Sequence, residues 1–429
     1  MSIKFEYHTN APTNNSFFQE SELLKRLDQF KAIIDNPEFG FFHLTDKTEY
    51  LDSTKVIFEK IKNKQHFVQV GIGGSALGPQ MLLSALGKFQ GKTFTLLDNT
   101  DSDHIEDELG KINLKESVFY IVSKSGGTAE TIACYALIRN KLTALGINEN
   151  EFSNYFVFCT DKENGQLREH VNKNNYDSLI VPNDVGGRFS VLTHVGLLPA
   201  LFFGIDIDAL FSGANNFKET ILSSDVKSNP LLQCAAHTYY LYKQIETVNE
   251  TVLMPYSSKL KDFSSWFVQL WAESLGKFSP AQGKAVGLTP VPGYGATDQH
   301  SQMQLFMEGP NNKLLFMLNI SEKVSDYHLT SDLELDCAKK LNGHSMNQLL
   351  EAEFQGTLKA LAENRRNVIH INIKRLDESS LSQLILFFES LTALMGEYFE
   401  INPFNQPGVE KGKIYAYEYL NSFPKFSDK

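Results

Sequence analysis

Long hydrophobic runs are absent from this sequence. No window reaches the roughly 20 apolar residues that a membrane-spanning helix needs, and the N-terminal segment has no apolar signal core. Apolar residues still make up 42% of the 429 residues, which is enough to bury a substantial core. A chain of this length is expected to form about two or three domains. We therefore expect a globular protein that is not attached to a membrane and that resides in the cytoplasm.

Positive charge and cysteine are both scarce. The 40 Lys and Arg residues are outnumbered by 51 Asp and Glu residues, which gives a formal net charge of −11. This balance argues against general binding to nucleic acids or anionic membranes, so an anionic substrate would need a local positive site. The four cysteines are widely scattered and show no metal-binding spacing, which predicts free thiols in a reducing compartment and no metal site. They are Cys134, Cys159, Cys234 and Cys337.

From about residue 50, short apolar strands alternate with helical patterns. Such alternation predicts a parallel sheet with helices on both faces and with ligands at the carboxyl ends of its strands. The predicted strands cover residues 66–72, 93–98, 117–123, 155–160 and 178–181. The predicted helices between them cover residues 76–86, 103–112, 129–145 and 165–172.

A second, less regular block of the same kind follows. It predicts a second α/β unit, with a helical arm beginning near Pro407. Its predicted helices cover residues 231–247, 262–276 and 298–306. Its predicted strands cover residues 251–256, 314–320 and 368–373.

A loop rich in hydroxyl groups and glycine separates one apolar strand from a long helical pattern. It reads SKSGGT over residues 123–128. The first N–H groups of the following helix lack partners, and the helix dipole favours negative charge there. Hydroxyl groups add donors, and glycine lets the backbone approach an anion closely. The loop is therefore predicted to bind a phosphate or carboxylate.

A second glycine-rich loop, GIGGSALGP over residues 71–79, follows the first strand. By itself it nearly matches a dinucleotide fingerprint, with Gly71, Gly73 and Ala76 in the key places and Asp98 as a possible ribose-binding acid. A tight strand-to-helix turn without any ligand is the alternative interpretation. Because both loops follow strands of one parallel sheet, they are expected to meet in one crevice, which favours anion binding without a dinucleotide.

Two charged residues stand in settings that suggest catalysis. Arg188 follows two glycines in the otherwise apolar segment DVGGRFSVLT (184–193), where a guanidinium can point inward and stabilise a developing oxyanion. A solvated or ion-paired surface arginine is the common alternative. Gln269 and Glu273 share one face of a predicted helix, and Glu273 is a candidate general base. An ordinary ion pair between Glu273 and Lys277 is the other interpretation.

Two further segments combine glycine with polar side chains. His300 is predicted in the first turn of the helix over 298–306, where a histidine can move protons or serve a structural role. In FNQPGVEKGK (404–413), Gln406 and Lys413 are seven positions apart and so lie on one side of a predicted helix. A solvated, charged helix start is the alternative for this pair.

In their order along the chain, these segments resemble those of glucose-6-phosphate isomerases, also called phosphoglucose isomerases. The segments DVGGRFSVLT and FNQPGVEKGK match two family signatures nearly intact, and the resemblance runs from about residue 60 to the C-terminus. It implies two sugar-isomerase (SIS) domains of the doubly wound α/β class, a homodimer, and no metal or organic cofactor. The expected segments are a helical N-terminal segment at 1–48, SIS domains at 49–205 and 206–402, and a C-terminal helical arm at 403–429.

The resemblance also implies a reaction. Glucose 6-phosphate and fructose 6-phosphate would be interconverted, as in glycolysis and gluconeogenesis, by ring opening and proton transfer through a cis-enediolate. Phosphate binding is assigned to Ser123, Lys124, Ser125 and Thr128, with Gly74 and Ser75 beside them.

The remaining site residues would surround the sugar. The chemistry of the implied reaction favours Glu273 for proton transfer between C1 and C2 and Arg188 for stabilisation of the enediolate. His300 and Lys413 are the candidates for ring opening, and His300 is expected to complete the site of the neighbouring subunit. Gln269 and Gln406 are expected to contact the sugar.

Three alternative functions are weighed against this one. A bifunctional glucose/mannose-6-phosphate isomerase would also accept the C2 epimer, but Lys124, Gln269 and the segment 404–413 resemble the monofunctional branch. A non-catalytic phosphosugar-binding regulator would have no reason to retain Glu273 together with the other catalytic candidates. The case for an NAD-dependent dehydrogenase depends only on the glycine loop and Asp98.

Overall fold

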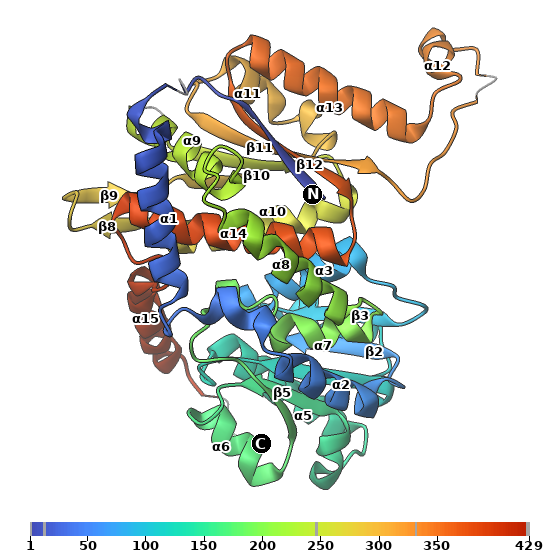
Figure 1. Ribbon diagram of the computed structural model, residues 1–429. Coiled ribbons are helices and arrows are strands. Elements are labelled where there is room, and N and C mark those ends of the chain that lie inside the picture. The colour runs from blue at the N-terminus through green and yellow to red at the C-terminus, as the bar shows by residue number, and fades with distance from the viewer. Residues whose placement is uncertain (1, 12–13, 245–247, 331–332, 426–429) are drawn as a thin grey trace.

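Two β-sheets, each covered by helices on both faces, form the framework of the protein (Figure 1). The computed structural model describes residues 2–11, 14–244, 248–330 and 333–425. One sheet lies in the lower half of Figure 1 and the other in the upper half, with long helices in the layer between them. The predicted α/β architecture is confirmed.

The first sheet is entirely parallel, with the strand order β3-β2-β4-β5-β6. Every residue of its central strand, SVFYIV, is buried. Successive side chains point to opposite faces, so an uninterrupted apolar run suits a sheet that is covered on both sides. The strands agree with the predicted ranges to within two residues; they are β2 (His66–Val70), β3 (Thr93–Leu97), β4 (Ser117–Val122), β5 (Phe156–Thr160) and β6 (Asp177–Ile180).

Helices cover both faces of the first sheet. Phe119 and Ile121 of β4 face one group of helices, while Tyr120 between them faces the other. The first group consists of α4 (Ser102–Gly110), α5 (Ala129–Ala144) and α6 (Gln166–Asn174). The second consists of α2 (Glu49–Ile61), α3 (Leu77–Leu86) and α7 (His194–Phe202).

The second sheet has the strand order β1-β12-β11-β7-β10, and only its edge strand β1 runs antiparallel to its neighbour. Three strands were predicted from their apolar runs: β7 (Glu250–Pro255), β11 (Lys313–Glu322) and β12 (Asn367–Arg375). The edge strand β10 (Thr289–Pro292) was not predicted, because its two prolines disfavour a strand in sequence terms.

The N-terminal segment differs from the helical prediction. It begins with strand β1 (Ile3–His8), which pairs with β12. Apolar Ile3, Phe5 and Tyr7 alternate with polar neighbours, which is the period of a strand with one buried face. The prediction of a wholly helical segment was wrong here, although helix α1 (Glu20–Ile34) follows.

The second sheet is also covered on both faces. Its outer face packs on α11 (Met303–Glu308) and α13 (Met346–Glu363). Its inner face packs on α9 (Pro230–Gln244), α10 (Lys261–Leu275) and α14 (Glu378–Phe399). Helix α14 is buried along almost its whole length and contacts α8 (Ile207–Ile221). Because α10 also packs on α3, one continuous core joins the two α/β units. The domain boundaries near residues 48, 205 and 402 therefore stay a proposal.

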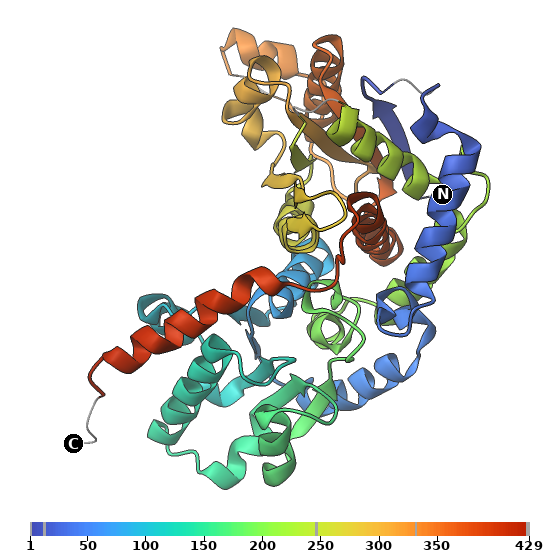
Figure 2. The same ribbon diagram turned by 90° about the vertical axis from the view of Figure 1, so that its left-hand side faces the viewer.

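The remaining elements lie at the periphery. The small helix α12 spans Asp336–Leu341, and a hairpin joins β8 (Lys277–Ser279) to β9 (Lys284–Val286). Helix α15 (Glu410–Ser422) extends away from the rest of the molecule (Figure 2). It forms the predicted C-terminal arm, and every one of its residues is exposed.

Two helical predictions differ from the structure in detail. The range 298–306 is divided into a 3₁₀ turn over Thr297–His300 and helix α11, which begins at Met303. The last residues of the predicted 231–247 helix, 245–247, lie outside the described residues, and α9 is described as far as Gln244. None of the helices in the described part of the chain combines the length and the apolar character that crossing a bilayer would require.

Candidate active site

The two predicted anion-binding loops lie at the same edge of the first sheet. β2 and β4 are parallel neighbours, and the loops 71–76 and 123–128 follow their carboxyl ends. In the second loop, the buried Ser123 Oγ accepts a hydrogen bond from the N–H of Gly126 at 3.1 Å and lies 3.0 Å from Oγ1 of Thr128. Ser125 is exposed and Thr128 is half-buried, so their hydroxyl groups are within reach of a ligand.

Gly74 and Gly73 allow the first loop to approach the rest of the site closely. A Cβ atom at Gly74 would lie 2.2 Å from the carbonyl oxygen of Gly187, so only glycine fits there. A Cβ atom at Gly73, whose φ is +59°, would lie 2.9 Å from Nε2 of Gln269. The half-buried Ser75 closes this turn, and its carbonyl oxygen accepts from Nε2 of Gln69 at 2.7 Å. The glycines thus bring this loop against two further predicted site segments.

Lys124 connects the second loop to the arginine segment. Its Nζ donates to the carbonyl oxygens of Asn183 at 3.0 Å and Val185 at 2.9 Å. Burial lowers the pKa of the Lys124 ammonium group, while Asp161 and Asp184 oppose this shift. Since an ammonium group has three N–H donors, one of them stays available for a ligand.

The Arg188 guanidinium joins three segments that are far apart in the sequence. Its Nε donates to Oγ of Ser274 at 2.6 Å, and its Nη1 donates to Oε1 of Gln406 at 2.8 Å. Its Nη2 donates to the carbonyl oxygens of Pro403 at 2.5 Å and Asn405 at 3.1 Å. These bonds use four of the five guanidinium N–H groups. Because the side chain is also only 2% exposed, the guanidinium is held in one orientation.

Glu273 lies beside this fixed cation. Its Oε1 is 3.3 Å from Nη1 of Arg188, and its Oε2 accepts from Nε2 of Gln269 at 3.0 Å. Burial lowers the pKa of the Arg188 guanidinium, whereas Glu273 acts in the opposite direction. A guanidinium stays charged at neutral pH, so the carboxylate faces a permanent positive charge.

The ordinary ion pair between Glu273 and Lys277 does not form. Nζ of Lys277 donates instead to the carbonyl oxygens of Ser274 at 2.9 Å and Asn402 at 2.6 Å. Burial and the nearby Arg188 lower the pKa of Lys277 to about 8. The structure therefore pairs Glu273 with Arg188 in preference to the lysine one turn away.

A pocket of about 1490 Å³ opens beside these groups. Gln269, Glu273, Lys277 and Gln406 line it, together with the chain over 402–409. Glu273 is 22% exposed, so its carboxylate is held from behind by Arg188 and remains accessible from the pocket. A small polar ligand in this pocket can reach a carboxylate, an amide and a cation together.

His300 and Lys413 are not brought to this cluster by their own chain. Within the described residues, neither makes a hydrogen bond or ion pair with Arg188 or Glu273. His300 is exposed at the end of its 3₁₀ turn. Lys413 is exposed on α15, where its Nζ lies 2.9 Å from Oε1 of Glu410.

Ser274 and the backbone of residues 403–405 were missed by reasoning from the sequence. Ser274 is fully buried and holds Nε of Arg188, while the carbonyl oxygens of Pro403 and Asn405 hold its Nη2. The adjacency of Ser274 to Glu273 was visible in the sequence. Backbone carbonyl acceptors leave no such signal, because any residue type supplies one.

Residues 41–426 match the family model described as phosphoglucose isomerase. The chain belongs to the phosphoglucose isomerase family. It is 38% identical over 376 residues to a glucose-6-phosphate isomerase of Thermus thermophilus, covering 87% of this chain and 88% of that protein. It is 34% identical over 417 residues to a glucose-6-phosphate isomerase of Campylobacter jejuni, covering 95% of this chain and 99% of that protein.

Two solved structures have the same fold as this chain. A hypothetical protein from Thermus thermophilus has a TM-score of 0.86 at 36% identity, covering 93% of this chain and 94% of that chain. A glucose-6-phosphate isomerase from Chlamydia trachomatis has the same fold, with a TM-score of 0.82 at 22% identity, covering 99% of this chain and 89% of that chain. The predicted fold class, two doubly wound α/β units of the sugar-isomerase type, is confirmed.

Proposed function

We propose that this protein interconverts glucose 6-phosphate and fructose 6-phosphate by acid–base catalysis. The observation that carries the proposal is the Glu273 carboxylate, held between Arg188 and Gln269 and exposed to a pocket. Aldose–ketose isomerisation needs one base that moves a proton between C2 and C1, and one fixed cation beside the oxygen atoms that become charged. Family membership over residues 41–426 supports the same reaction.

Glu273 is the proposed base. One oxygen atom accepts from Gln269, and the other faces Arg188 at 3.3 Å without a hydrogen bond, so it retains lone-pair capacity for a substrate proton. A single carboxylate on one face of a cis-enediolate can remove the proton from C2 and return it to C1. Positioned general-base catalysis is typically worth about 10²–10⁴-fold in rate.

Arg188 is the proposed electrostatic stabiliser of the enediolate. Four of its N–H groups are used within the protein, and Nη1, which carries the fifth, lies 3.3 Å from Oε1 of Glu273. An oxyanion that develops beside Glu273 can be stabilised by this donor and by the positive charge of Arg188. Because the guanidinium is already in place, the site needs no reorganisation during the reaction. Gln269 contributes as well, because its Nε2 orients Oε2 of Glu273 and its side chain lines the pocket, where it can contact a sugar hydroxyl. Gln406, which is exposed at the pocket, can contact the sugar in the same way.

The loops after β2 and β4 are the proposed phosphate site. Ser123, Ser125 and Thr128 supply hydroxyl groups at the start of α5, and Lys124 supplies its remaining N–H donor. Gly74 and Ser75 lie at the neighbouring strand end. Phosphate binding away from C1 and C2 contributes binding energy that positions the reacting carbons.

We further propose that the active enzyme is a homodimer. An isolated helix of this length is marginally stable in water, and every residue of α15 is exposed, including Ile414, Tyr417 and Leu420, as is Phe423 directly after it. Packing against a second copy would cover this face and hold Lys413 at the sugar. The exposed His300 would complete the site of the neighbouring subunit, and both residues would assist ring opening.

The proposed location is the cytoplasm. All four cysteines are free, and Cys134, Cys159 and Cys234 are buried as thiols. Unpaired cysteines are typical of proteins in reducing compartments. The proposed reaction uses phosphosugars and the chain's own side chains, with no nucleic acid, membrane or organic cofactor.

The test is interconversion of fructose 6-phosphate and glucose 6-phosphate by the purified protein in EDTA, with mannose 6-phosphate run in parallel. Rapid turnover of the first pair alone is expected. Comparable turnover of mannose 6-phosphate would assign the protein to the bifunctional branch. Phosphosugar binding without turnover would favour the regulator, and a requirement for NAD would favour the dehydrogenase.

A further inference from the structure

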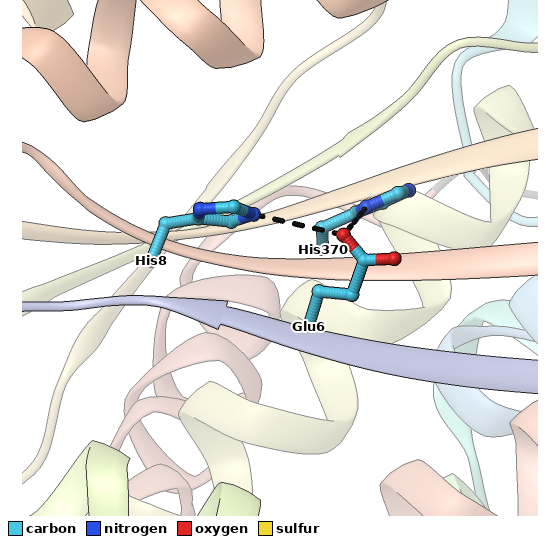
Figure 3. Close-up of side chains that lie close together, drawn as sticks. All are labelled: Glu6, His8 and His370. Carbon is cyan, nitrogen blue, oxygen red and sulfur yellow. Dashed lines mark hydrogen bonds and ion pairs between the residues drawn. The ribbon is translucent and has the colours of Figure 1, made fainter.

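Glu6, His8 and His370 form a cluster on the second sheet, outside the proposed catalytic pocket (Figure 3). β1 and β12 are antiparallel, and their register places Glu6 opposite His370. Glu6 and His8 are two positions apart on one strand, so they point to the same face of the sheet. One ligand atom from each residue lies within 4.8 Å of the other two. Pairing of the edge strand thus creates a set of two imidazoles and one carboxylate.

A network behind His370 determines which of its ring nitrogens carries the hydrogen. Nδ2 of Asn319 donates to the carboxylate of Glu351 at 3.1 Å, while Oδ1 of Asn319 accepts from Nδ2 of Asn372 at 3.0 Å. The opposite orientation of the Asn319 amide would place its oxygen against the Glu351 carboxylate and its NH₂ group against Nδ2 of Asn372. Oδ1 of Asn319 is therefore an acceptor, and the His370 Nε2 that lies 2.9 Å from it is the N–H donor.

This tautomer leaves an unfavourable contact on the other side of the ring. Nδ1 of neutral His370 presents a lone pair, and it lies 3.3 Å from Oε2 of Glu6. Nε2 of His8 lies 3.8 Å from the same oxygen atom and is buried without a hydrogen-bond partner within the described residues. The His370 lone pair, the partnerless Nε2 of His8 and a carboxylate oxygen therefore converge, and a cation bound with Nε2 of His8 unprotonated would satisfy all three.

We propose that Glu6, His8 and His370 bind a divalent transition-metal ion of the zinc type. Imidazole nitrogens favour such metals, whereas Ca²⁺ and Mg²⁺ prefer oxygen ligands. Bonds of about 2.0–2.1 Å in tetrahedral geometry separate neighbouring ligand atoms by about 3.4 Å. Two of the three observed separations, 3.3 and 3.8 Å, are close to that value, and the third is within 4.8 Å. Three protein ligands leave a fourth position for water. Water can reach this position because Glu6 is exposed to solvent.

The arrangement behind the site supports metal binding. Metal-bound histidines usually donate their other ring N–H to an oxygen acceptor, which fixes the ring and its tautomer. Asn319 plays this part for His370, and Asn319 is itself oriented by Glu351 and Asn372. The bound ion would fasten β1 to β12 across a separation of 364 positions along the chain. This explains why spacing in the sequence showed no metal motif. The inference goes beyond the proposed isomerase function and does not depend on it.

The test is a titration of the metal-free protein with ZnCl₂, monitored by isothermal titration calorimetry. The midpoint of thermal unfolding is then measured with and without Zn²⁺. It is performed in a Cys337→Ser background, because the exposed Cys337 thiol would otherwise bind zinc on its own. One Zn²⁺ ion per chain is expected, with a rise in the unfolding temperature. Glu6→Gln and His8→Gln are expected to weaken binding by at least about 10-fold.

His43→Gln is the matched control, because His43 is also a partly exposed histidine beside a carboxylate, with Nδ1 2.9 Å from Asp46. It should leave zinc affinity unchanged. Equal losses in His43→Gln and His8→Gln, or no stoichiometric binding, would overturn the proposal in favour of a protonated histidine–glutamate pair. Glu6 and His8 are chosen because His370 is buried and its replacement could prevent folding. The isomerase reaction in EDTA should be unaffected in all three variants, which separates this test from that of the proposed function.

Discussion

Nη1 of Arg188 lies 3.3 Å from Oε1 of Glu273, and the arginine side chain is 2% exposed while the glutamate side chain is 22% exposed. The cation is thus buried behind the carboxylate, and the carboxylate faces the pocket. Arg188 is also bonded to Ser274 and to the chain over 403–406, so its position depends on both of these segments. This arrangement connects the folding of the C-terminal region to the proposed chemistry.

Removing the Ser274 hydroxyl should disturb the cation without touching the substrate. Ser274→Ala leaves Nε–H of the buried Arg188 without its acceptor, which should lower the free energy of unfolding by about 1–3 kcal/mol. We expect kcat/KM to fall on the order of 10- to 100-fold, because a small displacement of a catalytic group is costly. Urea unfolding and steady-state kinetics measure the two effects.

Ser264→Ala provides the control on the same helix. Ser264 is also buried, but its Oγ donates to the carbonyl oxygens of Leu253 and Gly293. Its replacement should reduce stability and leave kcat/KM nearly unchanged. Equal kinetic effects of the two substitutions would mean that Ser274 acts only through general stability.

Hybrid dimers test the proposed contribution of His300 to the neighbouring site. His300→Ala and Glu273→Gln homodimers should each be inactive. After equal amounts exchange subunits, half of the dimers are hybrids and each hybrid has one intact site of two, so about a quarter of the wild-type activity should return. Mass spectrometry of differently labelled subunits verifies the exchange. Complete exchange without recovered activity would contradict a shared site.

Acid should destabilise the protein partly through His237. Burial lowers the pKa of His237 to about 4, and its Nδ1 lies 2.7 Å from Oγ1 of Thr9. The unfolded chain therefore binds a proton that the folded chain does not, between about pH 6.5 and pH 4. The associated stability is present above about pH 6.5 and is lost as the pH falls, by about 1.4 kcal/mol for each pH unit in that window.

His237→Gln should reduce this loss. Denaturant unfolding at pH 7, 6, 5 and 4.5 measures it as the difference between wild type and variant, in which the other titrating groups cancel. His43→Gln, at a partly exposed histidine, shows how much stability changes when an imidazole that is not buried is lost. Parallel stability curves for wild type and His237→Gln would show that His237 is not buried in its neutral form.

Much of the first α/β unit was predictable because its signals are local. The run SVFYIV of β4 is buried at every position, as its uninterrupted apolar character predicted, and the loop after it lies at the expected edge of the sheet. Arg188 points inward, as its two preceding glycines suggested. Each of these inferences needed only the period of a strand or the residues adjacent in sequence.

Long-range pairings were not predictable in the same way. Strand β1 pairs with β12, and its alternation extends over only six residues, so nothing nearby marks its partner. The register that brings His370 to Glu6 follows only from that pairing. The roles of His300 and Lys413 stay predictions for a related reason, because the contacts proposed for them are with a second copy of the chain.

The most direct test of the central claim is isomerisation by Glu273→Gln in D₂O. Glutamine has nearly the size of glutamate, and its amide oxygen can still accept from Nε2 of Gln269, so folding and phosphosugar binding should be preserved. The wild-type protein should incorporate deuterium at the carbon atom that receives the proton, and the variant should lose about 10²–10⁴-fold in turnover together with this incorporation. Near-normal turnover and deuterium incorporation by a folded Glu273→Gln protein would contradict the assignment of Glu273 as the base.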